Sequence, residues 1–103
     1  MSRYARFVCF DCKVQLWLGK ALFGHSPEQP SRFQIGTESP NSENLMLNRV
    51  LWKMLADHAS HSLRVVVEGD DYYVAVIAAG FVEIGGDEIK DISFEEYLKD
   101  WSG

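Results

Sequence analysis

The chain has 103 residues, with 10 Lys and Arg against 15 Asp and Glu, and its formal net charge is −5 at pH 7. This length predicts one domain, 1–103, with a single modest core. The negative charge argues against nucleic acid and anionic membranes as partners, because neither attracts an acidic surface. A protein partner, in particular a basic one, remains open.

The N-terminal residues predict a cytoplasmic protein. The sequence has no apolar run of about 18 residues, which is the length that a membrane-spanning helix needs. Only four residues separate Arg6 from Asp11, too few for the apolar core of a signal peptide. In the cytoplasm thiols stay reduced, so a close cysteine pair favours a metal or redox motif over a structural disulfide.

Two strands are expected at the start of the chain. Residues 4–10 are mostly apolar, β-branched or aromatic, and residues 13–18 alternate between the two faces of a strand. Cys9 and Cys12 would then lie at the bend between the strands. The alternative is a helix over residues 12–23, because the apolar positions there also fit a helical stripe.

The middle of the chain predicts an irregular connection followed by the longest helix. Residues 24–43 contain all three prolines among polar residues, although the segment around Phe33 is a candidate for docking on the core. From a cap at Ser42, the helix is expected to continue to the end of the stretch 45–61. At about 100° per residue, one stripe of this helix is apolar and faces the core. The residues of that stripe are Leu47, Val50, Leu51 and Met54.

Trp52 and Leu45 lie on the opposite side of this helix from the core stripe. Either a second layer covers them, or they form an exposed patch for a partner. We expect internal cover, by residues 27–40 or by the last helix.

The C-terminal half predicts further strands and a short helix. Residues 63–68 and 72–78 are expected to be strands joined by a turn at 69–71, and residues 81–84 to continue the second strand. Ser93 and Glu96 form a capping box that opens a short last helix. The fold class is therefore α+β: a small antiparallel sheet packed by one long helix, with a short C-terminal helix.

The clearest chemical pattern joins two residue pairs. His58 and His61 continue the apolar stripe, one above the other on the helix, and buried imidazoles need partners. Cys9 and Cys12 are the available counterpart, with 45 residues between Cys12 and His58. Zinc takes four sulfur or nitrogen ligands in a tetrahedron. The sequence therefore predicts that Cys9, Cys12, His58 and His61 converge on one metal ion, with zinc as the candidate cofactor.

Two other interpretations of the pairs remain open. Histidines in a last helical turn are favoured by the helix dipole, and buried cysteines can be small core residues, so all four can be inert. A redox pair is the other alternative. It needs Cys9 exposed at a helix N-terminus, and therefore the helical interpretation of residues 12–23.

The combination of motifs resembles a group of small bacterial proteins of unknown function. These proteins carry C-x-D-C-K near the start, L-G-K a few residues later, and a helix that ends in H-x-x-H before a strand. The resemblance implies that the two pairs are related, and it implies no activity or substrate. The matching residues here are Cys9, Asp11, Cys12, Lys13, Leu18, Gly19, Lys20, His58 and His61.

The favoured function is a small soluble module that is not an enzyme, with a structural zinc site and a protein partner. No catalytic residue is assigned, because no nucleophile motif surrounds the serines near the histidines. The alternative is a small thiol redox or metal-dependent enzyme that uses the Cys9/Cys12 pair.

Overall fold

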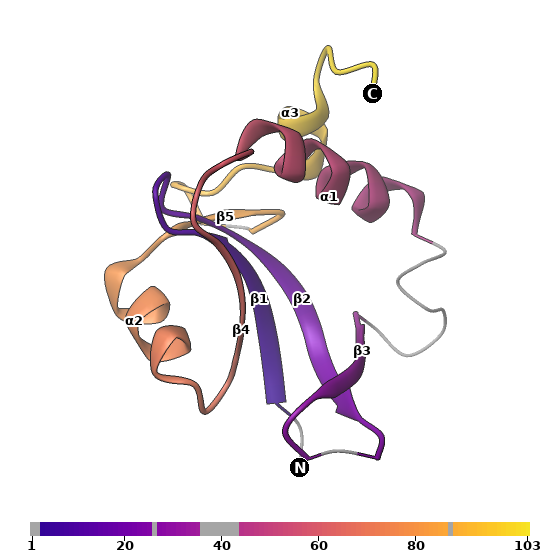
Figure 1. Ribbon diagram of the computed structural model, residues 1–103. Coiled ribbons are helices and arrows are strands. Elements are labelled where there is room, and N and C mark those ends of the chain that lie inside the picture. The colour runs from indigo at the N-terminus through magenta and orange to yellow at the C-terminus, as the bar shows by residue number, and fades with distance from the viewer. Residues whose placement is uncertain (1–2, 26, 36–43, 87) are drawn as a thin grey trace.

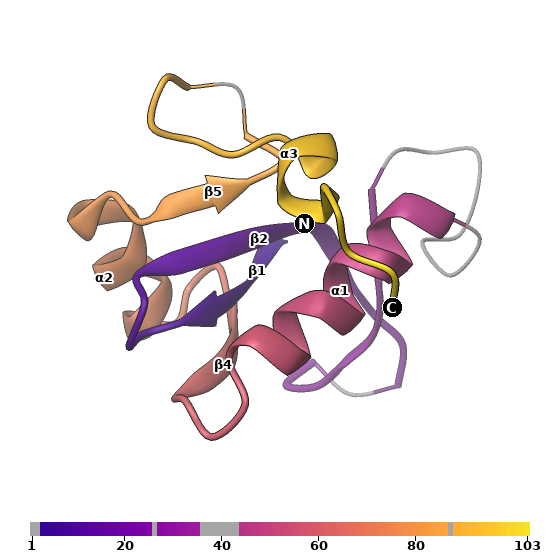
Figure 2. The same ribbon diagram turned by 90° about the horizontal axis from the view of Figure 1, so that it is seen from above.

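The computed structural model describes residues 3–25, 27–35, 44–86 and 88–103 and has an α+β fold. A curled sheet lies between helices on its two faces (Figures 1 and 2). Helix α1 (Leu45–Asp57) and helix α3 (Phe94–Leu98) pack on one face, and helix α2 (Asp71–Ala79) packs on the other. None of the helices in the described ranges is long and apolar enough to cross a membrane.

The sheet is antiparallel apart from one short strand. Strands β3, β2, β1 and β4 lie in this order, and each pairs antiparallel with its neighbour. Strand β5 pairs parallel with the start of β2. The predicted fold class is therefore confirmed, with β5 as a parallel addition. The strands are β1 (Arg3–Cys9), β2 (Val14–Phe23), β3 (Pro30–Gln34), β4 (Leu63–Val67) and β5 (Val82–Ile84).

The two predicted N-terminal strands are confirmed, and the helical alternative for residues 12–23 is wrong. The prediction of an irregular connection over residues 24–43 is wrong for β3, which pairs with the end of β2. Pro30 does not prevent this pairing, because it is the first residue of an edge strand and needs no ladder hydrogen bond there. Phe33 and Ile35 pack against the core, as expected for this segment.

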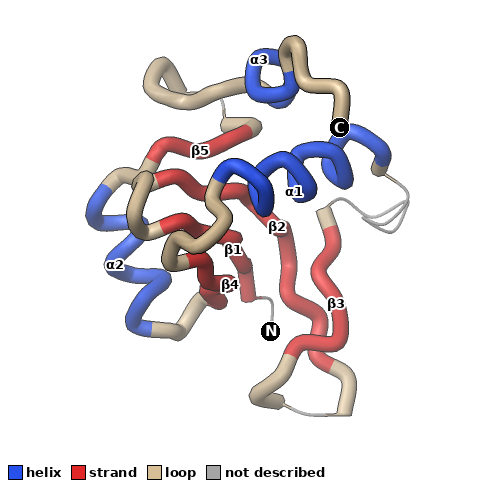
Figure 3. Tube along the Cα trace, turned by 45° about the horizontal axis from the view of Figure 1, so that its top comes forward, coloured by secondary structure: helices blue, strands red, loops and turns tan. Residues whose placement is uncertain are grey.

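Helix α1 crosses the sheet next to α3 (Figure 3). Its N-cap is Asn44, whose side-chain oxygen accepts a hydrogen bond from the Leu47 amide at 3.0 Å. Ser42, the expected cap, lies outside the described residues. The predicted stripe of Leu47, Val50 and Met54 is buried. The capping box of the last helix is also confirmed, because Ser93 Oγ accepts a hydrogen bond from the Glu96 amide at 3.1 Å.

The predicted strand over residues 72–78 is wrong, because this segment forms α2. Asp70 caps the helix by accepting a hydrogen bond from the Tyr72 amide at 3.2 Å, and Gly80 ends it in the left-handed conformation at φ 66°. The β-branched and aromatic residues between these caps favour a strand only weakly, and tertiary packing overrides such preferences. Val76 packs against Val66 on the face of the sheet opposite α1.

The core has two parts, one on each face of the sheet. The larger part joins α1, α3 and the inner positions of β1 and β2. The smaller part lies under α2 and consists of Val8, Val66, Val76 and Phe81. The buried residues of the larger part are Ala5, Leu16, Leu18, Ala21, Leu47, Val50, Met54, Ile84 and Leu98.

The expectation that a second layer covers Trp52 and Leu45 is wrong. Their exposed fractions are 69% and 79%. Helix α3 contacts the other flank of α1, where Lys53 lies over the Tyr97 ring at 4.3 Å and Arg49 over the Trp101 ring at 5.6 Å. The last helix therefore leaves the flank that carries Trp52 open.

Gly19 allows β3 to approach β2 closely. It has a φ of +82°, and a Cβ there would collide with the carbonyl oxygen of Gln34. We expect Gly19→Ala to lower the free energy of unfolding by about 3 kcal/mol, because a strained backbone costs about 1–2 kcal/mol and the collision adds to this cost. Urea denaturation measures the loss.

Gly69→Ala is the matched control, since Gly69 also has a positive φ of +100° but no atom lies within 4 Å of its Cβ position. This variant should lose only the conformational part, about 1 kcal/mol. Equal losses in the two variants would show that the contact with β3 does not constrain Gly19.

Candidate metal centre

The cysteine pair lies where β1 turns into β2. Cys9 is the last residue of β1 and is fully buried, whereas Cys12 lies in the turn and is exposed. Lys13, with a φ of 58°, completes the turn before β2 begins. The tight turn therefore brings the second sulfur back to the side of the sheet where the first one lies.

The histidine pair lies between α1 and β4. The helix ends at Asp57, and the amide of His58 donates the last helical hydrogen bond to the Met54 carbonyl at 3.1 Å. The expectation that both histidines continue one helical stripe is wrong for His61. Ser60 has a φ of 68°, and the His61 amide donates to the His58 carbonyl at 3.0 Å, which closes a turn instead. This turn still places the two rings 5.6 Å apart, centroid to centroid.

Hydrogen bonds hold these two connections together. The amide of Phe10 donates to the Ser62 carbonyl at 3.0 Å, and the amide of Ser62 donates to Asp11 Oδ2 at 2.9 Å. Asp11 therefore links the cysteine turn to the histidine turn. This role of Asp11 is not predicted by the cysteine–histidine pattern, although an Asp within a turn often accepts a backbone hydrogen bond.

The four predicted side chains converge. One ligand atom from each of Cys9, Cys12, His58 and His61 lies within 4.8 Å of the other three. His61 Nδ1 is 3.6 Å from Cys9 Sγ and 3.5 Å from Cys12 Sγ. Cys9 and His58 form the buried half of the cluster, and Cys12 and His61 form the exposed half. The cluster is therefore positioned to hold a metal ion.

The burial and the protonation of His58 are those expected of a metal ligand. Its Nδ1 is buried and has no hydrogen-bond partner in the described part of the chain. Leaving a buried polar atom without a partner costs about 1–3 kcal/mol, a cost that a bound ion can remove. Burial and the neighbouring His61 also lower the pKa of His58. The neutral imidazole that results is the form that binds metals.

Helix α3 fixes the end of α1 next to His58. Tyr97 Oη donates to Asp57 Oδ2 at 3.0 Å, and Lys53 Nζ lies 2.6 Å from the same oxygen. Burial opposes the charge of this carboxylate, but the hydrogen bonds from Lys53 and Tyr97 hold the pKa of Asp57 below its ordinary value. The last turn of α1 therefore has support on both sides, from α3 and from the sheet.

No protein-family model, curated protein or solved structure matched the chain. The resemblance to small bacterial proteins therefore stays a prediction.

Asp11 should increase the affinity of the site for a metal ion without binding the ion itself. We expect Asp11→Ala to weaken the binding of added Zn²⁺ by about tenfold or more, as is common when a group that orients the ligands is lost. A titration against a chelator measures the affinity. Asp11→Asn keeps an oxygen that can accept the Ser62 hydrogen bond, so it should weaken binding much less. Equal affinity of Asp11→Ala and the unaltered chain would remove this role.

Proposed function

We propose that the chain is a small protein-binding module, not an enzyme, in which Cys9, Cys12, His58 and His61 hold a structural zinc ion. The spacing of the ligand atoms carries the metal part of this proposal. Zinc binds sulfur at about 2.3 Å and imidazole nitrogen at about 2.0–2.1 Å, so a tetrahedral site separates S from N by about 3.5 Å. The two Sγ–Nδ1 distances of 3.5 and 3.6 Å match this separation.

A structural role follows from the number of ligands. Four protein side chains complete the tetrahedron, whereas a catalytic zinc site keeps one position open for water or substrate. The ion would join the turn after β1 to the turn after α1, two segments that lie far apart in the sequence. It would therefore stabilise the docking of α1 on the sheet.

The protein-binding part rests on exposed apolar side chains. Trp52, Leu45 and Leu55 are 69%, 79% and 43% exposed on the flank of α1 that α3 leaves open. Trp is enriched among the residues that carry most of the energy of protein interfaces. Together with the net charge of −5, this favours a partner with basic and apolar groups.

The alternative, a thiol redox or metal-dependent enzyme, has the Cys9-x-x-Cys12 spacing in its favour. Helix N-termini and cationic neighbours are what lower thiol pKa values in redox motifs. Here Cys9 ends a strand. Desolvation and the neighbouring Cys9 and Asp11 raise the pKa of Cys12. The surroundings of the pair therefore favour a metal ligand over a reactive thiol.

Thiol reactivity tests this alternative. In the metal-free protein at pH 7 we expect Cys12 to react with iodoacetamide no faster than free cysteine, because a raised pKa reduces the thiolate fraction. Mass spectrometry of the alkylated peptides gives the rate. A rate well above that of free cysteine would favour the enzyme instead.

Metal content tests the main proposal. Protein purified without chelator should contain about one zinc per chain, and the His58→Ala/His61→Ala double variant should contain none. Losing the ion should lower the free energy of unfolding by several kcal/mol, since structural zinc can contribute on the order of 10 kcal/mol. Elemental analysis and urea denaturation give the two values.

His25→Ala is the matched control, because His25 is an exposed histidine between β2 and β3 and not part of the four-residue cluster. It should keep both zinc and stability. An unaltered chain that holds no metal and cannot be reconstituted, or a double variant that retains zinc, would contradict the proposed site.

A further inference from the structure

Strand β4 has an outer edge that the described chain leaves open. It is the last strand of the sheet, and its pairing partner among the described residues is β1 alone. Natural sheets protect such edges with prolines, charges and bulges. Strand β3, at the other end, has Pro30, Arg32 and a register shift beside Phe23. Strand β4 reads LRVVV, with one charge, no proline and no register shift.

The hydrogen-bond pattern shows which groups of β4 face outward. On either side of the strand, the Ser62 carbonyl accepts from the amide of Phe10, the residue after β1, at 3.0 Å, and the Glu68 amide donates to the Tyr4 carbonyl of β1 at 2.8 Å. Since these bonds involve every second residue of an antiparallel strand, Val65 and Val67 direct their amides away from β1. No hydrogen bond between described residues takes up these amides, so they can pair with one more strand.

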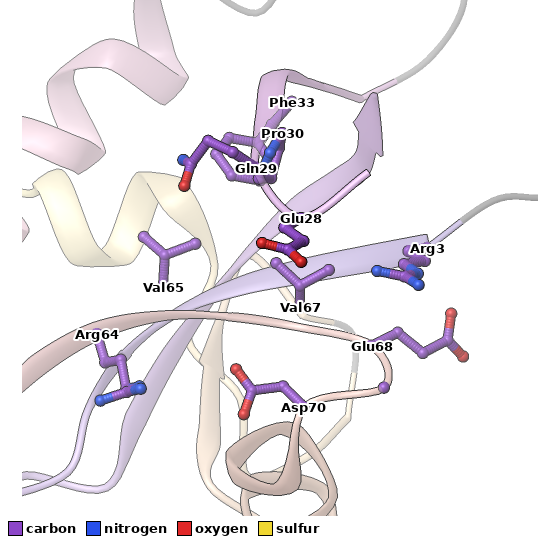
Figure 4. A pocket seen from close by; sticks show the side chains of 11 residues that line it. Arg3, Glu28, Gln29, Pro30, Phe33, Arg64, Val65, Val67, Glu68 and Asp70 are labelled. Atoms are coloured by element: carbon purple, nitrogen blue, oxygen red, sulfur yellow. The ribbon is translucent and has the colours of Figure 1, made fainter. Parts of the chain in front are cut away.

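A hollow of about 640 Å³ lies beside this edge (Figure 4), which is within the range of about 300–1,000 Å³ typical of binding sites. Val65 and Val67 line it from β4, and Pro30 and Phe33 line it from β3. Val65 is 43% exposed, an unusual state for a valine in a sheet with a packed face. The hollow therefore combines apolar side chains with free backbone donors.

Charged groups surround this apolar surface. Glu68 and Asp70 line the hollow just beyond the end of β4, and Glu28 lines it from the segment before β3. The two cations that line it, Arg3 and Arg64, lie over the rings of Phe23 and Tyr72 at 5.2 and 4.0 Å. Among the described lining residues carboxylates thus outnumber guanidinium groups, and the whole chain is acidic.

We propose that the outer edge of β4 binds an extended segment of a basic partner protein, which adds one strand to the sheet. The segment would pair with the amides of Val65 and Val67 and place every second side chain, apolar in character, in the hollow. A Lys or Arg in the segment would meet Glu68 and Asp70. This inference rests on the proposed protein-binding function and names its site.

A second copy of the chain fits this edge less well. Two β4 strands paired antiparallel about Val65 would bring the two Arg64 side chains into diagonal positions about 7–8 Å apart on one face. The pairing would also join two chains with a net charge of −5 each. A basic segment of another protein avoids both the repulsion between two Arg64 side chains and the repulsion between two acidic chains. The charges therefore favour it as the occupant.

The probe is a phage-displayed library of random peptides about ten residues long, the upper length of ordinary strands, selected on the full chain as purified. The strongest binders are then synthesised. They should alternate apolar residues with others and contain Lys or Arg. Amide exchange followed by NMR should show that the bound peptide slows exchange at Val65 and Val67 by at least about tenfold.

Two pairs of variants locate the binding. Val65→Pro removes an outward amide without touching the bonds to β1, whereas Val65→Thr keeps both the amide and a β-branched side chain. We expect the first to raise the peptide Kd at least about tenfold and the second to change it little. Glu68→Lys should weaken binding, and Glu95→Lys, at an exposed carboxylate on α3, should not. Circular dichroism shows whether each variant is folded.

Three results would overturn the inference. In the first, no selected peptide slows exchange at Val65 and Val67. In the second, folded Val65→Pro binds the peptide as tightly as Val65→Thr. In the third, these amides are already protected in a dimer of the free chain, which would make a second copy the occupant. Because zinc content is measured separately, failure here leaves the metal site standing, and failure of the metal site leaves this binding test intact.

Discussion

The rest of the structure depends on the contact between two turns, one after β1 and one after α1. The turn after β1 and the turn after α1 exchange backbone and side-chain hydrogen bonds through Phe10, Asp11 and Ser62. This contact sets the register of β4 on β1, because Cys9 pairs with Leu63 immediately beside it. It also fixes the end of α1 over the sheet. The four ligand atoms meet here, and each turn contributes one buried and one exposed side chain.

This arrangement links the candidate metal centre to the open edge. Strand β4 begins two residues after His61, so an ion held by His61 would fix the start of that strand. A preordered edge loses less conformational entropy when it pairs with a partner segment. The histidine half of the candidate metal centre and the outer edge of β4 thus belong to one continuous piece of chain, from the end of α1 through β4 to the cap of α2.

The spacing of apolar residues correctly predicted the elements whose two sides have different surroundings. Val14, Leu16 and Leu18 alternate because β2 has two different faces, and Leu47, Val50 and Met54 form a stripe because α1 has one buried side. The pattern failed for α2, which is apolar around most of its circumference. Its caps, Asp70 and Gly80, were visible in the sequence, but β-branched residues between two turn signals also predict a strand.

The amino-acid sequence was enough to identify the ligand chemistry, because its two cysteines form one close pair and two of its three histidines form another. It also determined the fold class, because periodicity is a local property. The three-dimensional fold was needed to establish that the pairs meet, that β3 begins at Pro30, and that Trp52 and the outer edge of β4 stay open in the described part of the chain. These features depend on contacts between residues far apart in the sequence. A local pattern of residues does not predict the free energy of such contacts.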